Sequence, residues 1–145
     1  MAIVTHPAEG NRLGRILVVD DEAQVRKPIS IMLAKDGYEV VEAADGQEAI
    51  EALRSGDNPL MVDTVLCDIR MPNINGKEAI VYFRSQFPGV PIVVMTGYPD
   101  VELAVSLMRQ GVRDYLIKPV TKEELLSVIR KSVDQHVVLK DQFAV

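Results

Sequence analysis

Two short, unbroken apolar runs constrain the fold of this chain more than any other feature. The run Ile16–Val19 reads ILVV, and the run Ile92–Met95 reads IVVM. A strand with one face in water alternates apolar and polar residues, whereas a strand buried on both faces is apolar throughout. The two runs therefore predict central strands of a sheet that is covered on both sides.

Segments with helical spacing of apolar residues separate five strand-like segments. The predicted strands cover 15–20, 38–43, 63–68, 90–96 and 113–119, and the predicted helices cover 22–37, 46–56, 76–89, 100–111 and 121–138. Such alternation is typical of a parallel sheet with helices on both faces, so we predict one doubly wound α/β domain. Pro28 lies inside the first helix, where a proline costs about 3 kcal/mol, so we expect that helix to start late or to kink.

The two ends of the chain differ from this alternating pattern. Residues 1–13 mix proline, glycine and asparagine without periodicity, so we predict a flexible N-terminal tail. The alternating segments define a domain over 14–136. Residues 137–145 are predicted to form a C-terminal tail or linker.

Composition limits the classes of function. The formal net charge of −5 argues against direct nucleic-acid binding by this chain. Apolar runs of only a few residues exclude a membrane-spanning helix. The single cysteine, Cys67, cannot form an internal disulfide, which favours a cytoplasmic location, and its place in a core strand predicts a packing role. His6 and His136 lie in the tail and the terminal helix, where we predict no ligand role.

Four of the predicted strands end in polar residues, in chain order Asp20-Asp21, Asp68, Thr96 and Lys118. Taken singly, an aspartate here can be a helix cap, a threonine before glycine a turn residue, and a lysine a solvated loop residue. Doubly wound sheets bind ligands at the carboxyl ends of their strands. We therefore expect these side chains to converge at one edge of the sheet.

Such a set of side chains has a definite chemistry. Crowded carboxylates need a cation to offset their repulsion, and oxygen ligands without paired His or Cys are typical of Mg²⁺. A carboxylate can also accept a phosphoryl group covalently. Mg²⁺ and Lys118 would then neutralise the charge on the transferred oxygens.

Four motifs make the chain resemble the receiver domain of bacterial two-component response regulators. They are ILVVDD at 16–21, CDIRMP at 67–72 followed by Gly76, VVMTGY at 93–98, and DYLIKP at 114–119. They occur in the order and spacing of that family across the predicted domain. The resemblance implies a flavodoxin-like (βα)5 fold of three layers, with strand order 2-1-3-4-5.

The resemblance implies a role for each acid. Asp68 is the expected phosphoacceptor, and Asp20 and Asp21 are expected to hold Mg²⁺ together with Asp68 and the backbone carbonyl of Arg70. Arg70 and Tyr98 occupy the positions that tune autodephosphorylation in the family. Both are bulky here, so we expect slow hydrolysis.

The resemblance also implies how the phosphoryl group is sensed. Thr96 is expected to bind it through its hydroxyl, and Lys118 is expected to pair with it. The Lys118-Pro119 peptide is expected to be cis. Tyr115 matches the aromatic residue that turns inward when the threonine moves, and Gly97 leaves the site open.

The implied partners are a sensor histidine kinase or phosphotransfer protein and a downstream effector. The effector would read the face formed by residues 100–111, 113–119 and 121–138, and a homodimer through the same face is a further expectation. No membrane partner and no enzyme activity beyond autocatalytic phosphate uptake and loss are expected. The segment 96–119 is most similar to receivers attached to transcriptional activators, so the chain is either a stand-alone regulator or part of a longer one.

Three other functions fit parts of the pattern. An aspartate-nucleophile phosphatase would need a second acid two residues after Asp68, where Arg70 stands. A pseudo-receiver that only binds partners would not need the intact acids or Lys118. A flavin binder shares the fold class, but Asp20 and Asp21 would repel the flavin phosphate.

Overall fold

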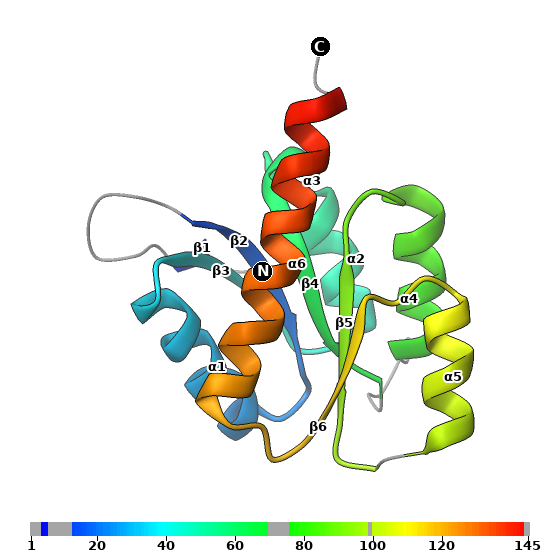
Figure 1. Cartoon of the computed structure of the whole chain (residues 1–145). Helices are drawn as coiled ribbons and strands as arrows, with labels where there is room; N and C mark the ends of the chain where they lie inside the picture. The colour runs from blue at the N-terminus through cyan, green and yellow to red at the C-terminus, as the bar shows by residue number, and fades with distance from the viewer. Residues whose placement is uncertain (1–3, 6–12, 70–75, 99, 144–145) are drawn as a thin grey trace.

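A central sheet lies between two layers of helices (Figure 1) in a computed structural model that describes residues 4–5, 13–69, 76–98 and 100–143. The strands are β1 Val4–Thr5, β2 Gly14–Val19, β3 Tyr38–Ala43, β4 Val62–Asp68, β5 Ile92–Thr96 and β6 Asp114–Ile117. The helices are α1 Ala23–Lys35, α2 Gly46–Arg54, α3 Asn58–Met61, α4 Gly76–Gln86, α5 Val101–Arg109 and α6 Lys122–Phe143.

The sheet has the order β1-β3-β2-β4-β5-β6. The strands from β2 to β6 are all parallel to one another, so the predicted five-stranded sheet with order 2-1-3-4-5 is confirmed. The two-residue strand β1 adds an antiparallel edge, with Val4 opposite Val41 and Thr5 opposite Val40. Two residues carry no periodicity, so this strand, inside the predicted tail, was missed.

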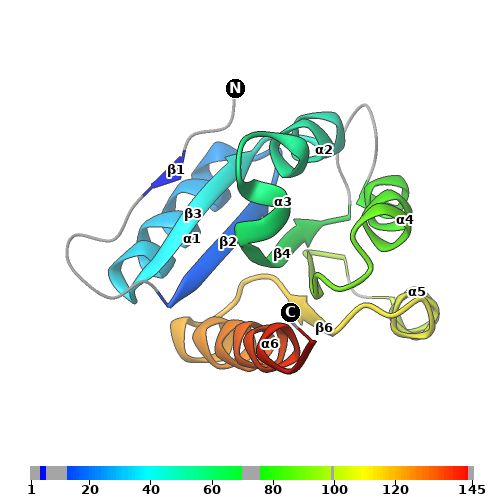
Figure 2. The same ribbon diagram turned by 90° about the horizontal axis from the view of Figure 1, so that it is seen from above.

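The sheet is buried on both faces, as its apolar runs predicted. Ile16 and Val18 belong to the core beneath α1 and α6, whereas Leu17 and Val19 belong to the core beneath α2, α4 and α5. All four side chains are fully buried. Figure 2 shows these helices on opposite sides of the sheet. The backbone of each central strand is therefore held rigidly, and so are the residues at its end.

Three helical features differ from the prediction. Helix α1 begins at Ala23 and continues through Pro28, so it does not start late. The proline is tolerated because only its own bond to the carbonyl of Gln24 is lost, and Gln24 lies at the exposed start of the helix. The short helix α3 was not predicted, and α6 runs to Phe143, through most of the segment interpreted as a tail or linker.

Helix α6 is the longest helix of the fold, but its apolar residues are interrupted by charges throughout. Within the described ranges, the structure has no helix that combines the length and the apolar character needed to cross a membrane.

Candidate functional site

The carboxyl ends of four parallel strands bring the predicted polar residues together. Asp20 directly follows β2, Asp68 ends β4, Thr96 ends β5 and Lys118 directly follows β6. Adjacent strands end level with one another, because Val19 pairs with Cys67, Asp68 with Met95, and Thr96 with Ile117. The predicted convergence at one edge of the sheet is therefore confirmed.

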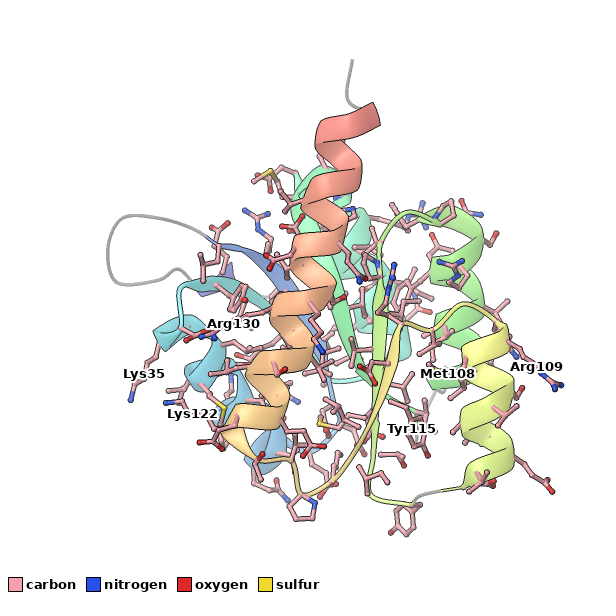
Figure 3. The ribbon with its side chains drawn as sticks, in the orientation of Figure 1. Lys35, Met108, Arg109, Tyr115, Lys122 and Arg130 are labelled. Atoms are coloured by element: carbon pink, nitrogen blue, oxygen red, sulfur yellow. The ribbon has the colours of Figure 1, made fainter. Side chains whose placement is uncertain are left out.

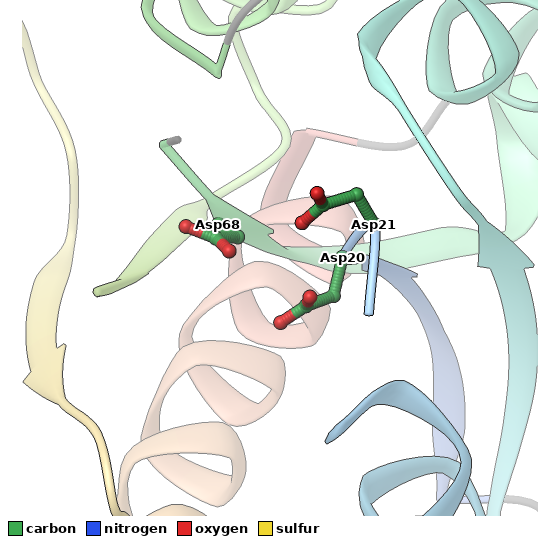
Figure 4. Close-up of side chains that lie close together, drawn as sticks. All are labelled: Asp20, Asp21 and Asp68. Atoms are coloured by element: carbon green, nitrogen blue, oxygen red, sulfur yellow. The ribbon is translucent and has the colours of Figure 1, made fainter. Parts of the chain in front are cut away.

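Three carboxylates form the centre of this edge (Figure 4). Asp20, Asp21 and Asp68 each offer a carboxylate oxygen, and these oxygens all lie within 4.8 Å of one another. Asp20 is fully buried and Asp68 is 4% exposed, whereas Asp21 is open to solvent. A hard cation with oxygen ligands and some retained water fits such a set, and Mg²⁺ has these preferences. No other group of this kind occurs among the residues that the structure describes.

Lys118 is the cation that faces the two buried acids. Its Nζ donates to Asp20 Oδ2 at 2.8 Å and to Asp68 Oδ2 at 3.0 Å. Burial lowers the pKa of Lys118, but the hydrogen bonds to Asp20 and Asp68 outweigh it, so the pKa is raised above its ordinary value. One ammonium facing three carboxylates leaves a net negative site, and a divalent cation would offset this charge.

A hollow of about 570 Å³ opens over these acids. Its lining residues are Asp21, Glu22, Asp68, Gly97, Tyr98 and Lys118. A Cβ atom added at Gly97 would have no neighbour within 4 Å, so this part of the lining faces open space. The carboxylate of Asp68 can therefore be reached from solvent although most of its surface is buried.

The hydroxyls of Thr96, at the end of β5, and Tyr115, in β6, have separate partners. The Thr96 Oγ1 atom accepts a hydrogen bond from the Tyr98 N–H at 3.1 Å, and the threonine is fully buried. The half-buried Tyr115 hydroxyl accepts a bond from the Asp100 N–H at 3.4 Å, at the start of α5 (Figure 3). The Lys118-Pro119 peptide is cis, as expected.

Two of the named residues have a simpler outcome. Arg70, with its predicted metal-binding carbonyl and its tuning role, lies outside the described residues. Cys67 is fully buried. Burial raises the pKa of its thiol, and the nearby Asp68 and Asp20 carboxylates raise it further. The predicted packing role of Cys67 is confirmed.

Sequence reasoning missed a pair of side chains behind the acidic edge, which is the end of the sheet that carries Asp20, Asp21 and Asp68. Arg26 of α1 donates to the backbone carbonyl of Asp20 at 2.6 Å and to Glu42 Oε1 at 3.0 Å. Glu42 lies in β3, inside a strand that is otherwise nearly all buried. A signal was present, because an acid in a buried strand needs a cationic partner.

Sequence reasoning also missed a polar network at the opposite end of the sheet. Arg15 is 4% exposed and donates hydrogen bonds to the side chains of Glu39, Asp57 and Asn58. Beside it, His136 Nδ1 lies 2.8 Å from Asp63 Oδ1. His136 thus has a structural partner, and it is not near the acidic edge.

Comparison with known proteins agrees with this geometry. Residues 16–130 match the family model described as the response regulator receiver domain. The chain is 36% identical over 129 residues to the regulatory protein AtoC of Escherichia coli strain K12, covering 89% of this chain and 27% of AtoC. It is also 36% identical over 118 residues to the CAI-1 autoinducer sensor kinase/phosphatase CqsS of Vibrio cholerae, covering 79% of this chain and 17% of CqsS.

Among solved structures, a response regulator receiver domain protein from Clostridium thermocellum superposes with a TM-score of 0.81 at 29% identity. That match covers 87% of this chain and 98% of the other. The chain thus spans about a quarter or less of AtoC and CqsS but nearly all of a separate receiver structure. It belongs to the response regulator receiver domain family.

Proposed function

We propose that the domain accepts a phosphoryl group on Asp68 from the phosphohistidine of a sensor histidine kinase or a phosphotransfer protein. An Asp68 carboxylate oxygen would form the new bond to phosphorus, and the bond between phosphorus and the donor imidazole would break. The imidazole nitrogen would keep that electron pair. The observation that carries the proposal is the cluster of three carboxylates within 4.8 Å, with Lys118 bonded to two of them beneath an open hollow.

Asp20, Asp21 and Asp68 would hold Mg²⁺, which supplies positive charge for the transferred oxygens. Lys118 already bonds Asp68 and would move its donor to a phosphoryl oxygen once that carboxylate has become an acyl phosphate. The Thr96 hydroxyl, which now accepts from the Tyr98 amide, could instead donate to the phosphoryl group. Catalysis would then be mainly positioning and charge neutralisation, and the domain would have no enzyme activity beyond its own phosphate uptake and loss.

The output surface would be the face made by α5, β6 and α6. Helix α5 and strand β6 expose apolar side chains on it, with exposed fractions of 81% for Val101, 48% for Met108 and 47% for Ile117. Figure 3 shows Met108 on α5, beside β6 and Tyr115. An effector or a second copy of the domain would bind this face when Tyr115 and α5 change position. Shifting such a switch from 1:99 to 99:1 requires about 5.5 kcal/mol of differential stabilisation.

Asp68→Asn tests the proposal directly. With acetyl phosphate and Mg²⁺, the native protein is expected to form an acyl phosphate that hydroxylamine cleaves, and the variant is expected to form none. Asp100→Asn is the matched control, since Asp100 is an exposed helix cap and asparagine caps equally well. Uptake of hydroxylamine-labile phosphate by Asp68→Asn would contradict the assignment. A native protein that neither takes up phosphate nor binds Mg²⁺ would be a pseudo-receiver that only binds partners.

The location stays an expectation. A histidine kinase donor and a single buried cysteine both fit the cytoplasm.

A further inference from the structure

Arg26 occupies an unfavourable position for a cation. It lies in the first turn of α1, where the helix dipole presents partial positive charge, and that turn has no acidic residue. Its side chain is only 13% exposed, so much of its hydration is lost. A charged group in such a place requires compensating contacts.

Two contacts supply that compensation. Arg26 Nε donates to Glu42 Oε1 at 3.0 Å, and Glu42 is itself 11% exposed. Arg26 Nη1 donates to the backbone carbonyl of Asp20 at 2.6 Å. The planar guanidinium thus bridges an acid on β3 and the main chain at the end of β2, a geometry that a point-like ammonium cannot reproduce.

Through this bridge, the end of β3 holds both sides of the Asp20 backbone. The Asp20 N–H donates to the carbonyl of Ala43 at 3.1 Å, and the Asp20 carbonyl is bonded through Arg26 to the neighbouring Glu42. The side chain of Asp20 is held separately, by the Glu22 N–H at 2.9 Å and by Lys118. The direction in which Asp20 and Asp21 leave the strand is therefore determined by contacts behind the acidic edge.

We propose that Arg26, oriented by Glu42, is a positioning residue that sets the Mg²⁺ affinity of the acidic edge through Asp20. The inference rests on the proposed function, because it needs Asp20, Asp21 and Asp68 to hold the ion. Groups behind a metal site raise its affinity by holding the ligands in place. The charge of Arg26 by itself would repel Mg²⁺, so the sign of the effect separates positioning from simple electrostatics.

The test compares Arg26→Gln with Lys27→Gln in Mg²⁺ titrations followed by the NMR shifts of amides around Asp21 and Asp68. Lys27 bonds the other oxygen of Glu42 at 3.1 Å, so Lys27→Gln removes one positive charge from the same acid as Arg26→Gln does. Unlike Arg26, Lys27 is 56% exposed. We expect Arg26→Gln to weaken Mg²⁺ binding about tenfold. Lys27→Gln should change it less than about twofold, because solvent screens an exposed charge.

A gain or no change in Mg²⁺ affinity in Arg26→Gln would overturn the inference, and so would an equal loss in Lys27→Gln. Thermal unfolding without Mg²⁺ shows whether Arg26→Gln is folded. If it is not, Arg26→Lys replaces it, and native affinity in that variant would also overturn the inference, since one ammonium cannot keep both bonds. A native protein that binds no Mg²⁺ would reject the proposed function as well, whereas native binding with an unaffected Arg26→Gln rejects only the role of Arg26.

Discussion

The two ends of the sheet both bury charged side chains, but they arrange them differently. At the carboxyl ends of the strands, Lys118 bonds Asp20 and Asp68 beneath an open hollow. At the opposite end, Arg15 bonds Glu39 and Asp57 through two different nitrogen atoms.

The cation at each end explains the difference. A guanidinium carries five donors in a rigid fork, so Arg15 reaches Glu39 through Nη2 and both Asp57 and Asn58 through Nη1. An ammonium is a compact point charge, and Lys118 leaves the oxygens of its acids within 4.8 Å of one another. Arginine therefore disperses acids into a structural network, whereas lysine leaves them close enough to share an ion.

The largest expected effect comes from removing Arg15, the cation at the end of the sheet opposite the acidic edge. Arg15→Met leaves the buried Glu39 carboxylate without its guanidinium partner, so the free energy of unfolding should fall by about 3 kcal/mol. Urea unfolding measures this loss, and Mg²⁺ affinity at the other end should be unchanged. Asp57→Asn is the control. Asp57 is 66% exposed, so this variant should lose less than about 1 kcal/mol of unfolding free energy. Equal losses in both variants would show that the network is not what stabilises this end.

Removing Lys118, the cation at the acidic edge, should affect the rate of phosphoryl uptake more than the stability of the fold. Lys118→Met is expected to slow phosphoryl uptake from acetyl phosphate about hundredfold, because the transferred oxygens lose a positioned positive charge. Lys122→Met, a change at an exposed lysine of α6, should have no effect. A rate for Lys118→Met within about twofold of the native rate would mean that the ammonium serves the fold alone.

Lys118 also predicts a pH dependence of stability. Its pKa is raised in the folded state by Asp20 and Asp68 against the effect of burial, so its stabilising contribution is complete below the ordinary value of 10.5. The contribution is lost as the pH rises through the higher folded-state pKa. The difference in unfolding free energy between native protein and Lys118→Met should therefore be constant from neutral pH up to the ordinary value of 10.5 and decrease above it.

The smallest effect is expected at the edge of the structural network. His136→Ala removes the 2.8 Å contact with Asp63 and should cost about 1 kcal/mol, because Asp63 still accepts from the Arg15 N–H at 3.2 Å. Gln135→Ala, at an exposed neighbour on the same helix, should cost less than half of that. Equal unfolding midpoints for the two variants would place His136 outside the network.

Residues with a local signal were predicted well, and residues whose role depends on distant contacts were not. The apolar runs and the polar residues that end them located the sheet and its acidic edge, because strand burial and strand direction are encoded locally. Arg26 was not found, since its partners Asp20 and Glu42 are brought to it by the pairing of β2 with β3. His136 was interpreted as a residue without a ligand role, and only the packing of α6 against β4 revealed its contact with Asp63.

The sequence by itself determined the fold class, the strand order implied by the family motifs, and the acids at the ends of the strands. The reason is that periodicity, apolar runs and motif spacing are properties of short segments. The tertiary structure alone decided which acids share space and which are kept apart. That choice depends on whether a lysine or an arginine from another element reaches them, and on whether the surrounding helices leave the carboxylates open to solvent.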